Sequence, residues 1–199
     1  MKAILNLSVI VLLSSCAAWR LQKTEVIKEY SAQIKSETQK IKMHLSVDKV
    51  THYLNGEKIS EKVEAVDTEK TLNIVRKAYQ ESELFDLVAK DQSDLEIKLE
   101  VEIHGKSDMT MTILTAATLF LFPSKTTDEF SIKARFFKGG EEVGDIEKFE
   151  TVTMYRQLFL IFALPFKSPF SISNETLVDL NRAIVTDAYD EGLFKQITD

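Results

Sequence analysis

The sequence predicts an α+β fold, a mainly antiparallel sheet with two helices packed on one face, preceded by an N-terminal helical tether. Three observations lead to this prediction. Several segments carry apolar residues at every second position, which is typical of strands with one buried face. Two other segments carry apolar residues at helical spacing and stand at separate places among these strands. Strands that follow one another in sequence, with helices at two positions, are typical of an α+β layer.

The strands are predicted from alternation and from the turns between them. The first begins at Ile41, and Asn55-Gly56 after it favours a tight hairpin turn because both residues tolerate positive φ. Leu95–Ile103 alternates without interruption and forms the clearest strand. Gly139-Gly140 permits a reversal between the last two strands. The remaining strands are expected over 84–88, 130–136 and 143–154.

Each helix is predicted from an inner apolar stripe and from its end signals. Asp67 or Thr68 is a suitable cap for the first helix. The second is expected to begin near Ser173 or Asn174, and Gly192 is well placed to end it. The expected buried residues of the first helix are Leu72, Val75 and Tyr79, and those of the second are Leu177, Leu180, Ile184 and Ala188.

The N-terminus has the pattern of a secretion signal. Lys2 precedes an apolar run, Ile4–Leu13, which is too short to span a bilayer as a helix. Leu13-Ser14-Ser15-Cys16 then closes the run and resembles the bacterial lipobox. The resemblance implies that residues 1–15 are a signal peptide, that cleavage occurs before Cys16, and that this thiol carries lipid. An ordinary signal peptide with an incidental cysteine, or a buried N-terminal helix, stays open as an alternative.

The lipobox resemblance sets expectations for location and organisation. Ala17 in place of Asp implies an outer-membrane lipoprotein that faces the periplasm. Residues 16–40 are expected to form a lipidated, partly helical tether, and 41–199 a single domain. The chain has a formal net charge of −6 and shows no basic cluster, which argues against a nucleic-acid partner. Cys16 is the only cysteine, so no disulfide is available within the chain.

Two uncharged apolar runs, Ile113–Phe122 and Leu158–Phe166, flank the predicted Gly139-Gly140 hairpin. Three interpretations are open. Both runs are central strands buried on two faces, or they form an exposed pair that enters a lipid interface or contacts a partner, or each subunit of an oligomeric pore contributes one apolar hairpin. Under the exposed interpretation, the residues expected to contact membrane or partner are Leu119, Phe120, Leu121, Phe122, Phe159, Leu160 and Phe162.

The sequence contains no motif that predicts catalysis or a cofactor. A nucleophile elbow, a zinc-binding helix and a phosphate-binding glycine loop are all missing. His44 and His104 fall on the polar faces of two expected strands, where Glu102 is a further metal ligand by type. Solvated histidines are commoner in such positions than metal ligands. The sequence therefore predicts no catalytic residue, no metal and no cofactor.

The mature chain loosely resembles small envelope-assembly lipoproteins, such as the lipopolysaccharide-transport lipoprotein that plugs its partner and the lipoprotein activators of cell-wall synthases. The resemblance lies in the layout of the helix at Thr68–Glu83, its exit at Ser82–Asp86, and Asp94 before the Leu95–Ile103 strand. It implies a non-enzymatic accessory or binding module for an envelope complex. The alternative is a lipid-binding or membrane-inserting module that uses the two apolar runs. The oligomeric state stays open.

Overall fold

The computed structural model describes residues 16–21, 24, 27, 29–35, 40–59, 64–119, 121–157 and 169–194. The strands are β1 (Cys16–Arg20), β2 (Ile41–Leu54), β3 (Glu57–Lys58), β4 (Phe85–Leu87), β5 (Leu95–Ser107), β6 (Ser124–Lys138) and β7 (Glu141–Arg156). The helices are α2 (Ala32–Lys35), α3 (Glu64–Glu81), α4 (Met109–Ala117) and α5 (Pro169–Asp190), with a 3-10 turn at Lys90–Gln92.

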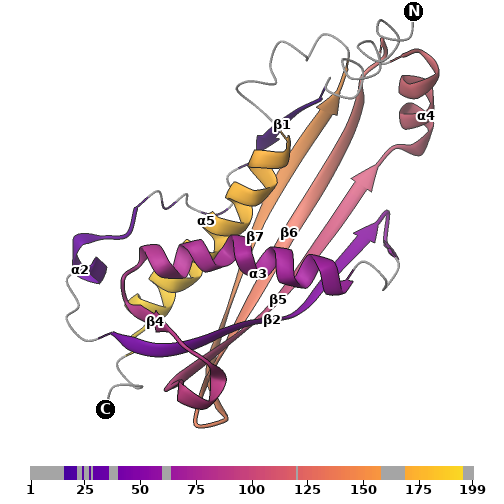
Figure 1. Ribbon diagram of the computed structural model, residues 1–199. Helices are drawn as coiled ribbons and strands as arrows, with labels where there is room; N and C mark the ends of the chain where they lie inside the picture. Colours follow the sequence, from indigo (N-terminus) through magenta and orange to yellow (C-terminus); the bar gives the residue numbers. More distant parts are fainter. Residues whose placement is uncertain are drawn as a thin grey trace, which may run out of the picture.

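Within the described residues the strands form one seven-stranded sheet, which Figure 1 shows as a long curved layer. The strand order is β1-β7-β6-β5-β2-β3, and β4 also pairs with β2. Neighbours are antiparallel except for two pairs, β2–β5 and β2–β4, which are parallel. The parallel β2–β5 pair needs a crossover connection, and α3 supplies it. The predicted α+β fold with a mainly antiparallel sheet is confirmed.

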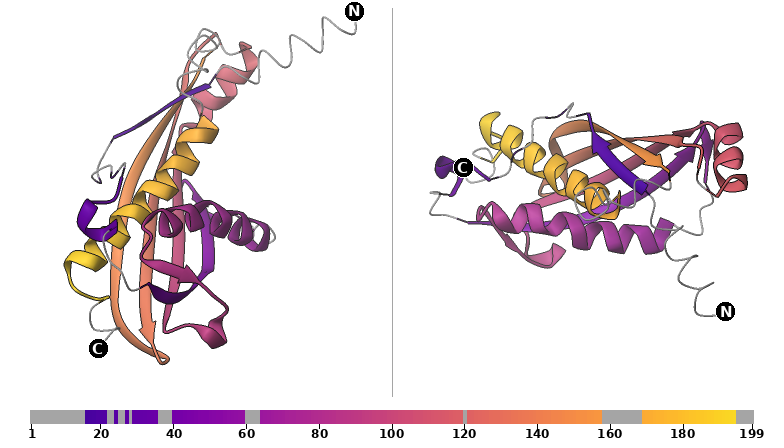
Figure 2. Two further views of the ribbon diagram at one scale, coloured as in Figure 1. Left: turned by 60° about the vertical axis from the view of Figure 1, so that its left-hand side comes forward. Right: turned by 90° about the horizontal axis from the view of Figure 1, so that it is seen from above.

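Helices α3 and α5 pack on the same face of the sheet, as the view from above in Figure 2 shows. The strand residues beneath them are apolar and buried at alternate positions, as the sequence predicts. The fully buried ones include Met43, Leu95, Ile97, Leu99, Ile132 and Phe136. The opposite face carries ion pairs such as Lys133–Asp145, with an N–O distance of 3.0 Å. The sheet therefore has one helix-covered face and one open, charged face.

Turns and helix ends follow the sequence prediction with two shifts. Gly56 and Gly140 have φ values of 89° and 92°, so both expected tight turns are confirmed. Helix α3 begins at Glu64, before the expected caps, and α5 begins at Pro169, before Ser173. Proline suits the first turn of a helix because it has no backbone N–H to leave unpaired, and this signal was missed.

The segment after Cys16 differs from the expected tether. Residues 16–20 pair with β7 at the edge of the sheet, and among the described residues of 16–40 only Ala32–Lys35 is helical. The apolar residues that predicted a helix are instead fixed by the domain. Tyr30 and Ile34 are buried, and the Tyr30 hydroxyl donates a hydrogen bond to the Ala78 carbonyl at 2.7 Å. Ile34 lies within the short helix α2 and Tyr30 just before it, so this part of the segment is held by burial against the domain.

We predict that Gly192→Ala lowers the free energy of unfolding by about 1 kcal/mol, because Gly192 ends α5 at a φ of 73°, where a Cβ is strained. The N–H groups of Gly192 and Leu193 donate to the carbonyls of Tyr189 and Ala188, both at 3.0 Å. Urea denaturation measures the effect. Asn174→Ala, at an exposed position of α5, should stay within about 0.5 kcal/mol of wild type. Equal stability of both variants would contradict the prediction.

Candidate functional site

The sheet end that carries α4 brings Cys16 close to the first apolar run. In register, Cys16 pairs with Arg156 across β1 and β7, and Arg156 pairs with Ser124 across β7 and β6. Neighbouring strands are about 4.8 Å apart, so the backbones of Cys16 and Ser124 lie roughly 10 Å apart. Phe122 precedes Ser124 by two residues. The expected lipidation position and the end of the first apolar run therefore lie at one end of the molecule.

The first half of the first apolar run, residues 113–117, belongs to helix α4. The Asp108 side chain caps α4 by accepting a hydrogen bond from the Met111 N–H at 3.0 Å. The hydroxyls of Thr115 and Thr118 each donate to the carbonyl four residues earlier at 2.7 Å. Since these hydroxyls are satisfied within the helix, the threonines add little polarity to the surface of α4.

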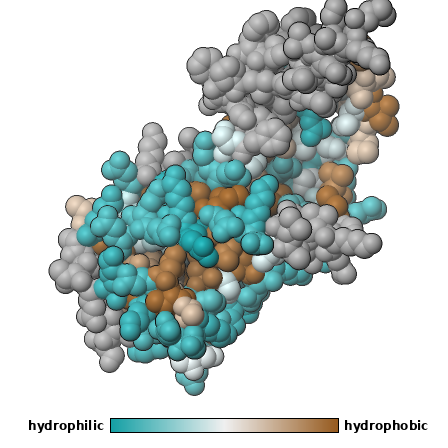
Figure 3. Space-filling view, viewed as in Figure 1, coloured by the Kyte–Doolittle hydropathy of each residue, from teal (hydrophilic) through white to brown (hydrophobic). Residues whose placement is uncertain are grey.

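The outer surface of this end is apolar. Thr115 is the only residue of α4 that is buried. Figure 3 shows apolar side chains at the upper right, where Figure 1 places α4. We call the exposed residues of this segment the α4 cap: Met109, Ile113, Leu114, Leu119, Leu121 and Phe122, of which Ile113 is 66% exposed. A grouped apolar surface of this kind marks an interaction site more often than isolated exposed residues do.

The α4 cap decides between the interpretations of the first apolar run. A central strand buried on two faces is wrong for Ile113–Phe122, because the run is a helix and a turn with exposed side chains. The strand of a pore hairpin is likewise not formed by this run. A continuous apolar run fits the helical period and the strand period equally well, so the sequence alone does not decide between a helix and a strand here.

The structure places three of the predicted contact residues on the surface. Leu119, Leu121 and Phe122 are exposed by 61%, 55% and 51%. Phe120 and the second-run residues Phe159, Leu160 and Phe162 lie outside the described residues. Cys16 is described only as part of the backbone of β1. The exposed interpretation is therefore supported for the part of the first run that the structure describes.

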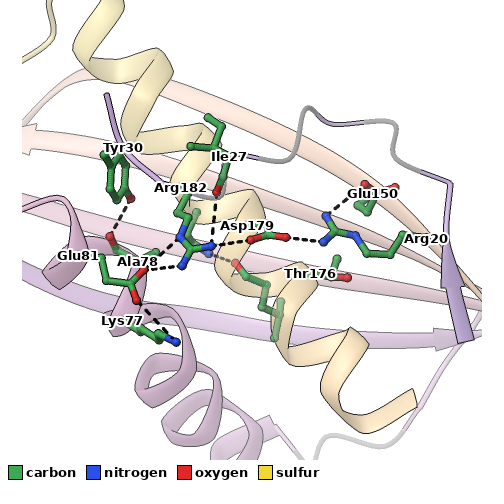
Figure 4. A network of polar contacts seen from close by, with 12 residues as sticks. Arg20, Ile27, Tyr30, Lys77, Ala78, Glu81, Glu150, Thr176, Asp179 and Arg182 are labelled. Atoms are coloured by element: carbon green, nitrogen blue, oxygen red, sulfur yellow. Dashed lines mark hydrogen bonds and ion pairs between the residues drawn. The ribbon is translucent and has the colours of Figure 1, made fainter. Parts of the chain in front are cut away.

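A polar network fixes the segment that follows Cys16 to the helices (Figure 4). Arg20 of β1 donates to Asp179 of α5 at 2.5 Å and lies 3.4 Å from Glu150 of β7. Arg182 of α5 donates to Asp179 at 2.9 Å and to Glu81 of α3 at 2.5 Å. The chain of contacts joins β1, β7, α5 and α3. It therefore holds the edge strand and both long helices in one arrangement.

Glu150 has the largest desolvation penalty in this network, because its carboxylate is fully buried. Its side chain is fully buried, and its second carboxylate oxygen accepts a hydrogen bond from the Thr151 N–H at 2.7 Å. A carboxylate withdrawn from water is stable only when a cation and hydrogen-bond donors compensate it. Arg20 is such a cation. This pair could not be predicted from the sequence, because its members are 130 residues apart.

A second candidate site is a cavity of about 250 Å³ between α3, α5 and the sheet. Apolar side chains, among them Val50, Phe130 and Leu177, form much of its wall. Asp128 also lines it, and burial raises the pKa of that carboxyl above its ordinary value. The cavity is smaller than most small-molecule sites, which begin at about 300 Å³. It has no second feature that indicates a particular ligand.

The described residues show neither a metal site nor a membrane-spanning helix. In that part of the chain no group of three or more His, Cys, Asp and Glu side chains is arranged to hold a metal. His44 and His104 are separated along the sheet, because His44 pairs with Glu96 and His104 with Tyr53. The described helices are also too short or too polar to cross a bilayer.

Comparison with known proteins finds only distant structural likeness. No protein-family model matches the chain, and no curated protein matches its sequence. A Helicobacter pylori protein, described as a homologue of a neuraminyllactose-binding hemagglutinin, matches with a TM-score of 0.39 and 9% identity, over 84% of this chain and 91% of its own. A Xanthomonas campestris protein of the DUF330 family matches with a TM-score of 0.39 and 13% identity, over 84% and 93%.

A third structure, the PelC dodecamer from Paraburkholderia phytofirmans, matches with a TM-score of 0.32 and 6% identity, over 84% of this chain and 95% of that one. At these TM-scores and identities the three likenesses are distant, and no activity, ligand or assembly of those proteins carries over to this chain. The fold class of this chain therefore rests on its own structure, which is a mixed, mostly antiparallel sheet with helices on one face.

We predict that Arg20→Met lowers the free energy of unfolding by about 3–5 kcal/mol, because it removes a cation that compensates two carboxylates withdrawn from water, Glu150 and Asp179. Chemical denaturation measures the change. Lys133→Met is the matched control: it removes the lysine from the exposed Lys133–Asp145 pair and should cost at most about 1 kcal/mol. A small effect for both variants would mean that the network does not hold β1 in place.

We also predict that the free energy of unfolding falls as the pH rises above about 10. Burial raises the pKa values of Tyr30 and Tyr79 far above the ordinary value of 10.0. The two tyrosines then ionise in the unfolded chain but not in the folded one, so alkaline pH favours unfolding. Their contribution is fully present below pH 10 and is lost above it.

Denaturation between pH 9 and 11 measures this slope. Tyr79→Phe should reduce the slope, and combining it with Tyr30→Phe should reduce it further, even though each variant also loses a buried hydrogen bond, Tyr79 to Asn181 at 3.0 Å and Tyr30 to Ala78 at 2.7 Å. An unchanged slope in the double variant would contradict the assignment.

Proposed function

We propose that this chain is a lipid-anchored, non-enzymatic module of the bacterial cell envelope that binds and assists an envelope protein complex. The observation that supports the proposal is the position of Cys16, which leads directly into β1 without an intervening spacer. A lipid attached at Cys16 would hold the α4 end of the sheet against a membrane surface. The location that fits this anchor is the periplasmic side of the outer membrane.

An anchored molecule of this kind would present the rest of its length to a partner. The Gly139-Gly140 turn lies at the opposite end of the sheet from α4 (Figure 1). The open face between the two ends carries exposed charged pairs, such as Lys106–Glu129 at 3.1 Å, together with the half-exposed ring of Phe149. Such a mixed surface suits a protein partner better than a small substrate.

A second candidate function is a lipid-binding or membrane-inserting module that uses the runs 113–122 and 158–166. The exposure of Leu119, Leu121 and Phe122 favours it. The two candidates differ in what the protein is for: the first requires a protein partner, whereas the second requires only lipid.

We predict that Cys16→Ser moves the protein from the membrane fraction to the soluble fraction, because the thiol is the proposed attachment point of the lipid. Cell fractionation and intact-mass measurement of the purified wild type test this together. Adding Ser93→Cys to Cys16→Ser restores a thiol at a partly exposed site and should not restore membrane association. A wild-type mass without added lipid would refute the anchor.

Affinity capture of the anchored wild type in mild detergent separates the two candidate functions. A stoichiometric envelope protein in the eluate supports the accessory module. Recovery of the chain alone, together with bound lipid, favours the lipid-binding module.

A further inference from the structure

We propose that the α4 cap is a second membrane contact, which enters the headgroup region of an anionic bilayer beside the lipid on Cys16. The inference rests on the proposed function, because the anchor determines which end of the sheet meets the bilayer. It deepens that proposal by naming the partner of this surface as lipid and by defining how the domain stands on the membrane.

The first argument is the apolar surface that the cap leaves in water. Ile113, Leu119, Leu121 and Phe122 are each more than half exposed, and they lie within ten residues of one another. Burying a large apolar side chain is favourable by about 1.5–3 kcal/mol. Each of these side chains is already partly shielded, so insertion contributes roughly half of that value per side chain, and the four together favour weak, reversible membrane binding.

The second argument is position. The register Cys16–Arg156–Ser124 places the anchor two strands away from the residue that follows Pro123 and the cap. The β2–β3 hairpin lies near the same end, since the Asn55 side chain accepts a hydrogen bond from the Ser107 N–H at 2.9 Å, just before α4. Leu54 and Ile59 of this hairpin region are 38% and 45% exposed. A bilayer that holds the lipid of Cys16 therefore lies within reach of the cap.

The third argument is the charge beside the cap. Lys125 is exposed at the start of β6, and Arg156 ends β7 opposite Ser124. Asp108, the N-cap of α4, is an exposed acid at this end, and its side chain accepts a hydrogen bond from the Met111 N–H. Tyr155, which pairs with Lys125, is 38% exposed. Basic and aromatic residues next to an apolar surface are typical of segments that lie in the interface of anionic membranes. The basic side chains stand out because the whole chain is acidic, with a net charge of −6.

The connection between Cys16 and the domain is rigid, so a membrane contact at the α4 cap would also set the orientation of the domain. Strand β1 begins at Cys16 and is tied to α5 by Arg20 and Asp179, so no flexible linker separates anchor and domain. Two contacts on one rigid end fix the tilt of the sheet, whereas the lipid alone leaves rotation free. The open face and the Gly139-Gly140 end then point away from the bilayer surface.

Vesicle flotation tests the inference independently of lipidation. The protein is the chain from residue 16 to 199 with Cys16→Ser, which contains every described residue and carries no lipid. The vesicles contain phosphatidylglycerol and phosphatidylcholine in one set and phosphatidylcholine alone in the other. The unmodified surface should bind the anionic vesicles, and Phe122→Asp should weaken this binding by roughly tenfold or more.

Phe149→Asp is the matched control. Phe149 is a phenylalanine of nearly identical exposure, 52% against 51% for Phe122, but it lies in the middle of β7 on the open face. It should leave vesicle binding unchanged. Lys125→Glu should weaken binding to the anionic vesicles several-fold. Circular dichroism and the unfolding midpoint check that Phe122→Asp, Phe149→Asp and Lys125→Glu are all folded.

Three outcomes would overturn the inference: no binding to anionic vesicles, equal loss in Phe122→Asp and Phe149→Asp, or self-association through the cap, seen by light scattering as a dimer that Phe122→Asp dissociates. None of these outcomes affects the lipid on Cys16, which the mass of the wild type decides separately. Conversely, a wild type without lipid that still binds anionic vesicles through Phe122 would retain the membrane contact and refute only the covalent anchor.

Discussion

The arrangement of the whole molecule depends on the buried ion pair between Arg20 and Glu150. It joins the edge strand β1 to β7 beneath α5, and Asp179 and Arg182 extend it to Glu81 on α3. Because Glu150 is fully buried, its charge needs compensation, and Arg20 is a cation that supplies it. The pair thus makes the position of β1, and with it the position of Cys16, a condition of a well-folded domain. Residues 16–20 are thereby held on the domain as the edge strand of its sheet.

The α4 cap differs from the ion pair, because its apolar side chains do not stabilise the domain. Its side chains gain nothing from the fold, since Leu119, Leu121 and Phe122 remain in water in the isolated chain. Their threonine neighbours satisfy their own hydroxyl groups along the helix, which keeps the segment both helical and apolar. Such a segment is explained by an environment outside the domain. The ion-pair network fixes β1 to the domain, whereas the cap leaves apolar side chains exposed at the same end of the sheet.

Much of the fold could be predicted from the sequence, and the failures have specific physical causes. Strict alternation over Leu95–Ile103 and the glycines at 139 and 140 predicted their elements correctly, because backbone geometry alone imposes those patterns. The strand at residues 16–20 was not predicted, because its pairing with β7 is decided by partners far away in sequence, as is the burial of Tyr30. The exposed cap was one of several alternatives, since an uncharged run is compatible with burial and with exposure alike. The Arg20–Glu150 pair was missed because its two members are also far apart in sequence.

The pairing of β1 with β7 also sets an order of events during biogenesis. The two strands come from opposite ends of the chain, and the Arg20–Glu150 contact spans 130 residues. Contacts of such long range form late, after the loop between them has been closed. We therefore expect the residues that follow Cys16 to join the sheet only after β7 has become available. Under the proposed lipidation of Cys16, a processing enzyme would act in this interval, before β1 pairs with β7.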